Sequence, residues 1–196
     1  MNRRILSALP VTGVLAGTAL LGLATTAYPG GYRWSEHTIS ALFQPATPGG
    51  VANPARLLAV TGVLAAMSGI ALLFHLTSNQ AGSAFQKKAI RIGGISSTAF
   101  ATLTVTLLHD LMVGLSLVCF VVALCAVLHM LYRERARVLF TLGVLFVAIE
   151  LGTAVLYFGQ VFLEWLPAGQ KAALVLIGLW LLAVQHRSGV LETSSR

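Results

Sequence analysis

The sequence predicts an all-α, polytopic membrane protein: a bundle of six transmembrane helices with a short amphipathic helix in the first outer loop. Of its 196 residues, 57% are hydrophobic and only 10% are charged, whereas about a quarter of the residues of a soluble domain are charged. The apolar residues form six long runs, and the basic residues lie in short clusters between these runs. A chain with so little polar surface is expected to be surrounded by lipid.

Each apolar run is long enough to cross a bilayer as a helix. A helix rises about 1.5 Å per residue and the hydrocarbon core is about 30 Å thick, so a span needs about 20 apolar residues. Lipid offers the backbone no hydrogen-bond partners, which requires helical structure there. The third and fourth runs meet at His109 and Asp110, where a tight hairpin is expected. The predicted spans of a single transmembrane domain, residues 1–196, are 5–27, 55–76, 90–109, 111–132, 138–158 and 168–186.

The first run is expected to be retained as a span rather than removed as a signal peptide. Arg3 and Arg4 precede it, as they would in a signal peptide, but the run is longer than most signal-peptide cores. Residues 25–27, Thr-Thr-Ala, also form a poor cleavage site. An N-terminal span is therefore predicted.

The basic residues predict the orientation of the chain. Cytoplasmic segments of membrane proteins carry an excess of Lys and Arg. If the N-terminus is inside, ten of the 13 basic residues fall in cytoplasmic segments, and only Arg33, Arg56 and Lys171 fall outside. Both termini are therefore predicted to lie in the cytoplasm, with the chain in the cytoplasmic membrane. The ten are Arg3, Arg4, Lys87, Lys88, Arg91, Arg133, Arg135, Arg137, Arg187 and Arg196.

This distribution also bears on the partners of the protein. The net charge of +7 would favour nucleic acid only if it formed a patch on a soluble face. The clusters instead follow membrane topology and suit contact with anionic headgroups. Membrane lipids are the expected partners, with a second copy of the chain or another membrane protein as further candidates, and no nucleic acid.

Residues 28–54 form the long outer loop. Ser35 is a suitable N-cap for a short helix from about Glu36 to Phe43. In that helix His37 and Ser40 lie on a polar face opposite an apolar one, as in a helix at the membrane interface. The loop is either an interfacial anchor or part of a site that contains Glu36, His37 and Ser40.

Glu150 lies within the predicted span 138–158, about 12 residues from its cytoplasmic start. An ionised carboxylate at this depth costs several kcal/mol unless it is paired, hydrogen-bonded or protonated. Its side chain is therefore expected to face the bundle interior or a wet cavity. Either it is a structural carboxyl bound to a neighbouring helix, or it belongs to a substrate, proton or ion site.

Several polar residues converge on the outer half of the bundle. Histidines and carboxylates together can bind a divalent metal or perform acid–base chemistry, although no metal-binding spacing links these residues. Haem is not expected, because His75, His129 and His186 lie near cytoplasmic helix ends and are not paired at matched depths. The predicted pocket residues are Glu36, His37, Ser40, Arg56, His109, Asp110 and Glu150.

Three segments also resemble a known family: YPGGYRWSEHTISALF in the outer loop, the NPAR entry to the second span, and HDLMVGLSLVCF at the start of the fourth. They are similar to the bacterial multipass family "domain of unknown function 998". They are more distantly similar to the FGF-receptor-activating-protein/DRAM membrane family, which also begins a central span with His-Asp or His-Asn. The nearer family has no established activity, so the resemblance implies location and fold. It marks Ser35, His37, Ser40, His109 and Asp110 as motif positions.

Three classes of function stay open at this point. The favoured one is a non-enzymatic protein that binds or carries a lipid or small molecule, or a partner subunit, with a cavity around Glu150 and the outer loop as its lid. The second is a metal- or acid/base-dependent intramembrane lipid hydrolase or transferase. There His37 or His109 would be the base, Asp110 and Glu36 the orienting or metal-binding carboxylates, and Ser35 or Ser40 the nucleophile. The third is a proton- or ion-coupled transporter that uses Glu150 and His109.

Overall fold

The computed structural model describes residues 3–194, with side chains described for residues 8–187. Arg196 and the side chains of Arg3 and Arg4, which entered the orientation argument, lie outside that description. Within it the chain is all-helical and has no strand beyond one isolated bridge. Five helices are long and apolar enough to cross a membrane. They are α1 (Arg3–Thr26), α2 (Arg56–Ser78), α5 (His109–Arg133), α6 (Arg137–Gly159) and α7 (Leu166–Ser194).

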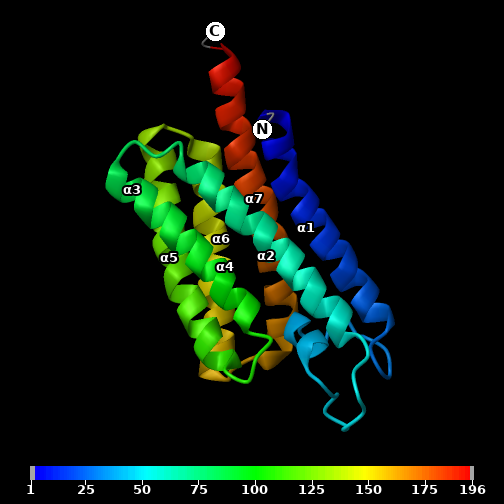
Figure 1. Cartoon of the computed structure of the whole chain (residues 1–196). Coiled ribbons are helices and arrows are strands. Elements are labelled where there is room, and N and C mark those ends of the chain that lie inside the picture. The colour runs from blue at the N-terminus through cyan, green and yellow to red at the C-terminus, as the bar shows by residue number, and fades with distance from the viewer. Residues whose placement is uncertain (1–2, 195–196) are drawn as a thin grey trace.

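The helices pack side by side along one direction (Figure 1). One end of the bundle carries both chain ends and the turns at 79–83 and 134–136, and is called the terminal end below. The opposite, loop end carries the long loop 27–55 and the connections at 104–108 and 160–165, the last of which contains the short 3-10 helix η3 (Leu163–Trp165).

The segment between α2 and α5 is helical but irregular. Three elements follow one another without a break: α3 (Ala84–Lys88), the π-helical turn η2 (Ala89–Gly93) and α4 (Gly94–Leu103). Ser83 caps the start of this segment by accepting a hydrogen bond from the backbone N–H of Gln86. A helical path therefore covers residues 84–103, whereas the sequence predicted a span over 90–109.

The predicted hairpin at His109 and Asp110 needs correction. The chain reverses over residues 104–108, and His109 and Asp110 form the first turn of α5. The hydroxyls of Thr104 and Thr106 donate to the carbonyls three residues earlier, at 2.7 Å each. Helix α4 thus ends at Leu103, and the two threonines lie in the turn before His109 and Asp110.

The predicted amphipathic helix from Glu36 to Phe43 is also not the structure found. The loop contains only the 3-10 helix η1 (Ile39–Phe43), which is preceded by Thr38, and Ser35 does not cap it. The turn before it is held by backbone bonds from Glu36 and His37 N–H to the carbonyl of Arg33. Contacts to the rest of the bundle, described below, shape this loop more than helical periodicity does.

Helices α1 and α2 pack closely against each other through small residues. A Cβ atom added at Gly17 would lie 2.5 Å from the backbone N of Ala66 and from the backbone O of Gly62. One added at Gly69 would lie 2.6 Å from the backbone O of Pro10. The small residues Gly62, Ala66 and Gly69 of α2 therefore let the two helix backbones approach closely.

The apolar residues fall into an interior and an outer surface. One buried cluster, around Phe74, Leu124 and Leu181, fills the bundle toward the terminal end. A second, around Tyr28 and Leu42, lies beneath the long loop. Many large apolar side chains nevertheless point outward, including Leu57, Val118, Leu145, Val155 and Leu179, which are 77%, 64%, 58%, 63% and 60% exposed. Outward leucines and valines on helices of this length are the surface expected of a protein in lipid.

Candidate functional site

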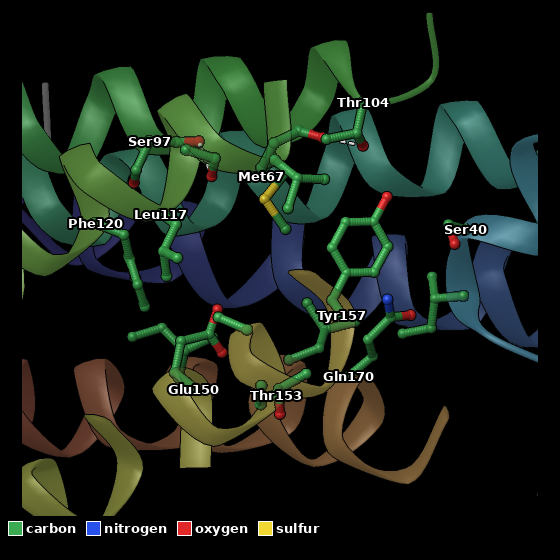
Figure 2. A pocket seen from close by; sticks show the side chains of 18 of the residues that line it. Ser40, Met67, Ser97, Thr104, Leu117, Phe120, Glu150, Thr153, Tyr157 and Gln170 are labelled. Carbon is green, nitrogen blue, oxygen red and sulfur yellow. Dashed lines mark hydrogen bonds between the residues drawn. The ribbon is translucent and has the colours of Figure 1, made fainter. Parts of the chain in front are cut away.

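A pocket of about 270 Å³ lies inside the loop half of the bundle. Its walls come from α2, α4, α5, α6 and α7, and η1 of the long loop covers one end. In Figure 2, Glu150 and Thr153 lie opposite Ser97 and Thr104, while Ser40 and Gln170 lie toward the loop. Most of the wall is apolar. Its polar residues are Ser40, Ser97, Thr98, Thr104, His109, Ser116, Glu150, Thr153, Tyr157 and Gln170.

Glu150 enters the pocket because of its place on α6. Four other residues of α6 line the same pocket and are spaced three, four or seven positions from Glu150. They are Phe146, Thr153, Ala154 and Tyr157. This spacing is that of one helix face. Among the residues that the structure describes, none forms a hydrogen bond or ion pair with the Glu150 carboxyl, and no Lys or Arg lines the pocket. The expectation that this side chain faces the bundle interior is met.

The hydroxyls on the wall donate to backbone carbonyls. Those of Ser97, Thr98, Thr104 and Thr153 bind carbonyls three or four residues earlier, at 2.7 to 2.9 Å. The Ser116 hydroxyl crosses from α5 to α4 and donates to the carbonyl of Ser97 at 2.9 Å. A hydroxyl has one proton to donate and two lone pairs, so these five groups can offer only lone pairs to a ligand.

His109 reaches the pocket from the first turn of α5. Its Nδ1 lies 2.6 Å from the carbonyl oxygen of Thr104. A carbonyl can only accept, so Nδ1 carries a proton and the neutral ring presents Nε2 as an acceptor. The rings of His109 and Tyr157 are neighbours, with centroids 6.2 Å apart.

Asp110 lies beside His109 but not in the pocket lining. Its carboxylate accepts a hydrogen bond from the hydroxyl of Tyr157, which joins the start of α5 to the end of α6. It also occupies the first turn of a helix, where a negative charge is favoured by the helix dipole. Its contacts are those of a helix-positioning residue.

The long loop places its polar residues outside the pocket, apart from Ser40, whose hydroxyl pairs with that of Thr38 at 2.9 Å. Glu36 forms an exposed ion pair with Arg33 at 2.7 Å. The Nδ1 of His37 accepts the backbone N–H of Arg33 at 3.1 Å. Arg56 donates from Nε to the carbonyl of Phe43 at 3.0 Å and so anchors the end of the loop.

Tyr32 and Lys171 hold this loop against the bundle. Both donate to the carbonyl of His37, the Tyr32 hydroxyl at 2.8 Å and the Lys171 ammonium at 2.7 Å. The ammonium also donates to the carbonyl of Trp34 at 2.8 Å and lies 5.4 Å from the centre of the Tyr32 ring. Burial, with a smaller contribution from Tyr28, raises the pKa of Tyr32 to about 12, so its hydroxyl stays protonated and remains a donor at physiological pH.

Of the residues predicted for a site, the structure therefore gathers Glu150, His109 and Ser40 around one pocket, and it leaves Glu36, His37, Arg56 and Asp110 outside the lining. Several other side chains at the pocket and its loop were missed, including Lys171 and Gln170. Lys171 was counted only as an outer charge, and Gln170 was not considered. Gln170 shares a helix face with the lining residues Ala173, Leu174 and Ile177, so its spacing from that apolar stripe was the available signal.

Two of the pocket's side chains, Glu150 and His109, are of metal-binding types. Within the described part of the chain, no group of three or more His, Cys, Asp or Glu side chains is placed to hold a metal ion.

No protein-family model, curated protein or solved structure matches this chain. Its class therefore follows from its own fold and site. Its described part is all-helical, with five helices long and apolar enough to cross a membrane, and it contains a mostly apolar pocket with one carboxylate in its lining.

Proposed function

We propose that this protein is a six-span protein of the cytoplasmic membrane that binds or carries a small amphipathic molecule, without chemical conversion, in the pocket around Glu150. The sixth span is the continuous helical path over residues 84–103. With this span counted, successive connections alternate between the two ends of the bundle (Figure 1). Without it, the turns at 79–83 and 134–136 would lie on opposite sides of the membrane.

The orientation rests on charge. The terminal end carries Lys87, Lys88 and Arg91 near one turn and Arg133, Arg135 and Arg137 around the next, whereas the loop end carries few basic residues. An excess of Lys and Arg marks the cytoplasmic side, so the terminal end is assigned to the cytoplasm.

Cysteine labelling tests this topology. In a background with Cys119 and Cys125 changed to alanine, Ser35→Cys is expected to react with a membrane-impermeant maleimide on intact cells. Gly82→Cys and Glu134→Cys are expected to react only after the membrane is opened. Labelling of Gly82→Cys and Glu134→Cys from opposite faces would rule out the six-span arrangement.

The pocket is the observation that carries the proposed binding function. An engineered cavity of about 150 Å³ holds one benzene molecule, and this pocket of about 270 Å³ is larger. Mostly apolar walls with a few convergent polar groups are typical of small-molecule sites. A ligand with an apolar body and one polar group matches this lining.

The contacts of the candidate catalytic residues support binding rather than hydrolysis. A hydrolase needs a nucleophile within hydrogen-bonding reach of its base. In the described structure the Ser40 hydroxyl pairs with Thr38, His37 Nδ1 accepts a backbone N–H, and His109 donates to a carbonyl. Among the described residues, no serine hydroxyl is hydrogen-bonded to His37 or His109.

A pocket-filling substitution tests the binding site. Ala154→Phe projects a ring into the pocket, whereas Ala148→Phe on the same helix points outward. With the protein in nanodiscs, calorimetry with 2-phenylethanol is expected to show binding that Ala154→Phe lowers by about tenfold or more, since displacing a ring-sized ligand forfeits over 1.4 kcal/mol. Ala148→Phe is expected to bind like wild type. Equal binding by the two variants would contradict the proposed site.

A further inference from the structure

Most of the hydrogen-bonding capacity left unused in the pocket is that of acceptors, apart from the amide N–H groups of Gln170. As described above, the hydroxyls of five wall residues already donate to backbone carbonyls, and Tyr157 donates to Asp110. The Nδ1–H of His109 likewise donates to the carbonyl of Thr104. These hydroxyl and imidazole groups can therefore only accept hydrogen bonds from a ligand.

Two further acceptors in the lining have no partner among the described residues. The side-chain carbonyl oxygen of Gln170 is buried and accepts no hydrogen bond. The Glu150 carboxyl likewise has no hydrogen bond or ion pair, and no Lys or Arg lines the pocket to balance its charge. A buried polar group without a partner costs about 1 to 3 kcal/mol, and more if it is charged. Both acceptors would therefore be stabilised by a bound donor, and Glu150 by a cationic one.

Aromatic rings complete the surroundings of Glu150. Phe146 lies one turn before it on α6, and Phe120 of α5 meets Phe146 edge-on, with centroids 5.8 Å apart. Both rings line the pocket. Aromatic rings attract cations electrostatically as well as packing against apolar groups, so these rings suit either end of an amphipathic cation.

We propose that the ligand of this pocket is a protonated primary amine with an apolar or aromatic body, whose ammonium group donates to Glu150. This assignment rests on the binding function proposed above and names its ligand class. It combines three observations: six of the wall hydroxyls already donate to other groups, the one acid in the described lining is unpaired, and that lining lacks a basic side chain other than His109. The apolar body occupies the space beside Met67 and Leu117.

Probes matched in size test this assignment. Calorimetry in nanodiscs of zwitterionic lipid, at neutral pH and with empty nanodiscs subtracted, compares phenethylammonium with 2-phenylethanol and 3-phenylpropanoate. A hydrogen bond between charged partners contributes about 1.5 to 3 kcal/mol, so the ammonium is expected to bind about tenfold to hundredfold more tightly than the alcohol. The carboxylate is expected to bind most weakly. Glu150→Gln is expected to remove the preference for the ammonium but not the binding of the alcohol, and Glu150→Asp to retain part of the preference.

The outcomes separate the ligand class from the binding function. If the alcohol binds and Ala154→Phe abolishes that binding, but the ammonium shows no preference or keeps it in Glu150→Gln, the amine assignment is overturned and the pocket stands. If none of the three probes binds, both proposals are overturned. Glu150→Asp keeps the comparison decisive if Glu150→Gln fails to fold, because a shorter acid that left the preference unchanged would also contradict a direct contact.

Discussion

Replacing Gly17 with leucine is expected to lower the thermal stability of the detergent-solubilised protein more than any other single change considered for this chain. At this position α1 touches the α2 backbone, and even a methyl group would lie 2.5 Å from the N of Ala66 and the O of Gly62. Backbone atoms cannot move aside as a flexible side chain can, so the helices must separate. Overpacking of this kind typically costs about 1 to 3 kcal/mol and occasionally more, and the upper part of that range is expected here.

Gly22→Leu is the matched control. Gly22 lies on the same helix, and a Cβ atom there would meet nothing within 4 Å. Its thermal midpoint, followed by circular dichroism in the same detergent, is expected to stay close to that of wild type. Because leucine is a better helix former than glycine by roughly 0.8 kcal/mol, the control can even gain stability. Equal midpoints for the two variants would show that the α1–α2 contact does not hold the bundle together.

The helices were largely predictable because lipid imposes a simple rule on the chain. A long apolar run in hydrocarbon must satisfy its backbone internally, and five of the predicted runs coincide with long helices. The segment 84–103 is less regular: the π-helical turn η2 divides it, and Gly93 and Gly94 pack closely against α5 and α2. Hydrophobicity alone does not encode such a local change of winding, so the predicted boundaries were displaced along the chain.

The loop and the pocket show where sequence reasoning reaches its limit. The inward orientation of Glu150 could be predicted from one physical argument, the free-energy cost of exposing a carboxylate to lipid. His37 and Glu36 were grouped with it only because they share the outer half of the bundle, and a shared depth does not determine a contact. Their positions depend on bonds between distant segments, such as that from Lys171 to the His37 carbonyl, 134 residues away along the chain. Periodicity within one segment carries no information about such a bond.

That bond leads to a second large effect: Lys171→Met is expected to release the long loop from the bundle. Methionine keeps the unbranched apolar stem but loses the ammonium, which donates to the carbonyls of Trp34 and His37 at 2.8 and 2.7 Å. A hydrogen bond from a charged donor contributes about 1.5 to 3 kcal/mol. Because η1 covers one end of the pocket, release of the loop is also expected to open that end.

Hydrogen–deuterium exchange measures the release directly. Peptides covering residues 33–44 are expected to exchange about tenfold to hundredfold faster in Lys171→Met, since local opening sets the exchange rate of protected amides. Lys87→Met, at an exposed site on the terminal end, is expected to leave these peptides unchanged, and neither variant should alter exchange in the middle of α5. Unchanged exchange over 33–44 in Lys171→Met would mean that the apolar cluster around Tyr28 and Leu42 holds the loop without the ammonium. The lid would then be a packed element of the core, and its closure would not depend on a single charge.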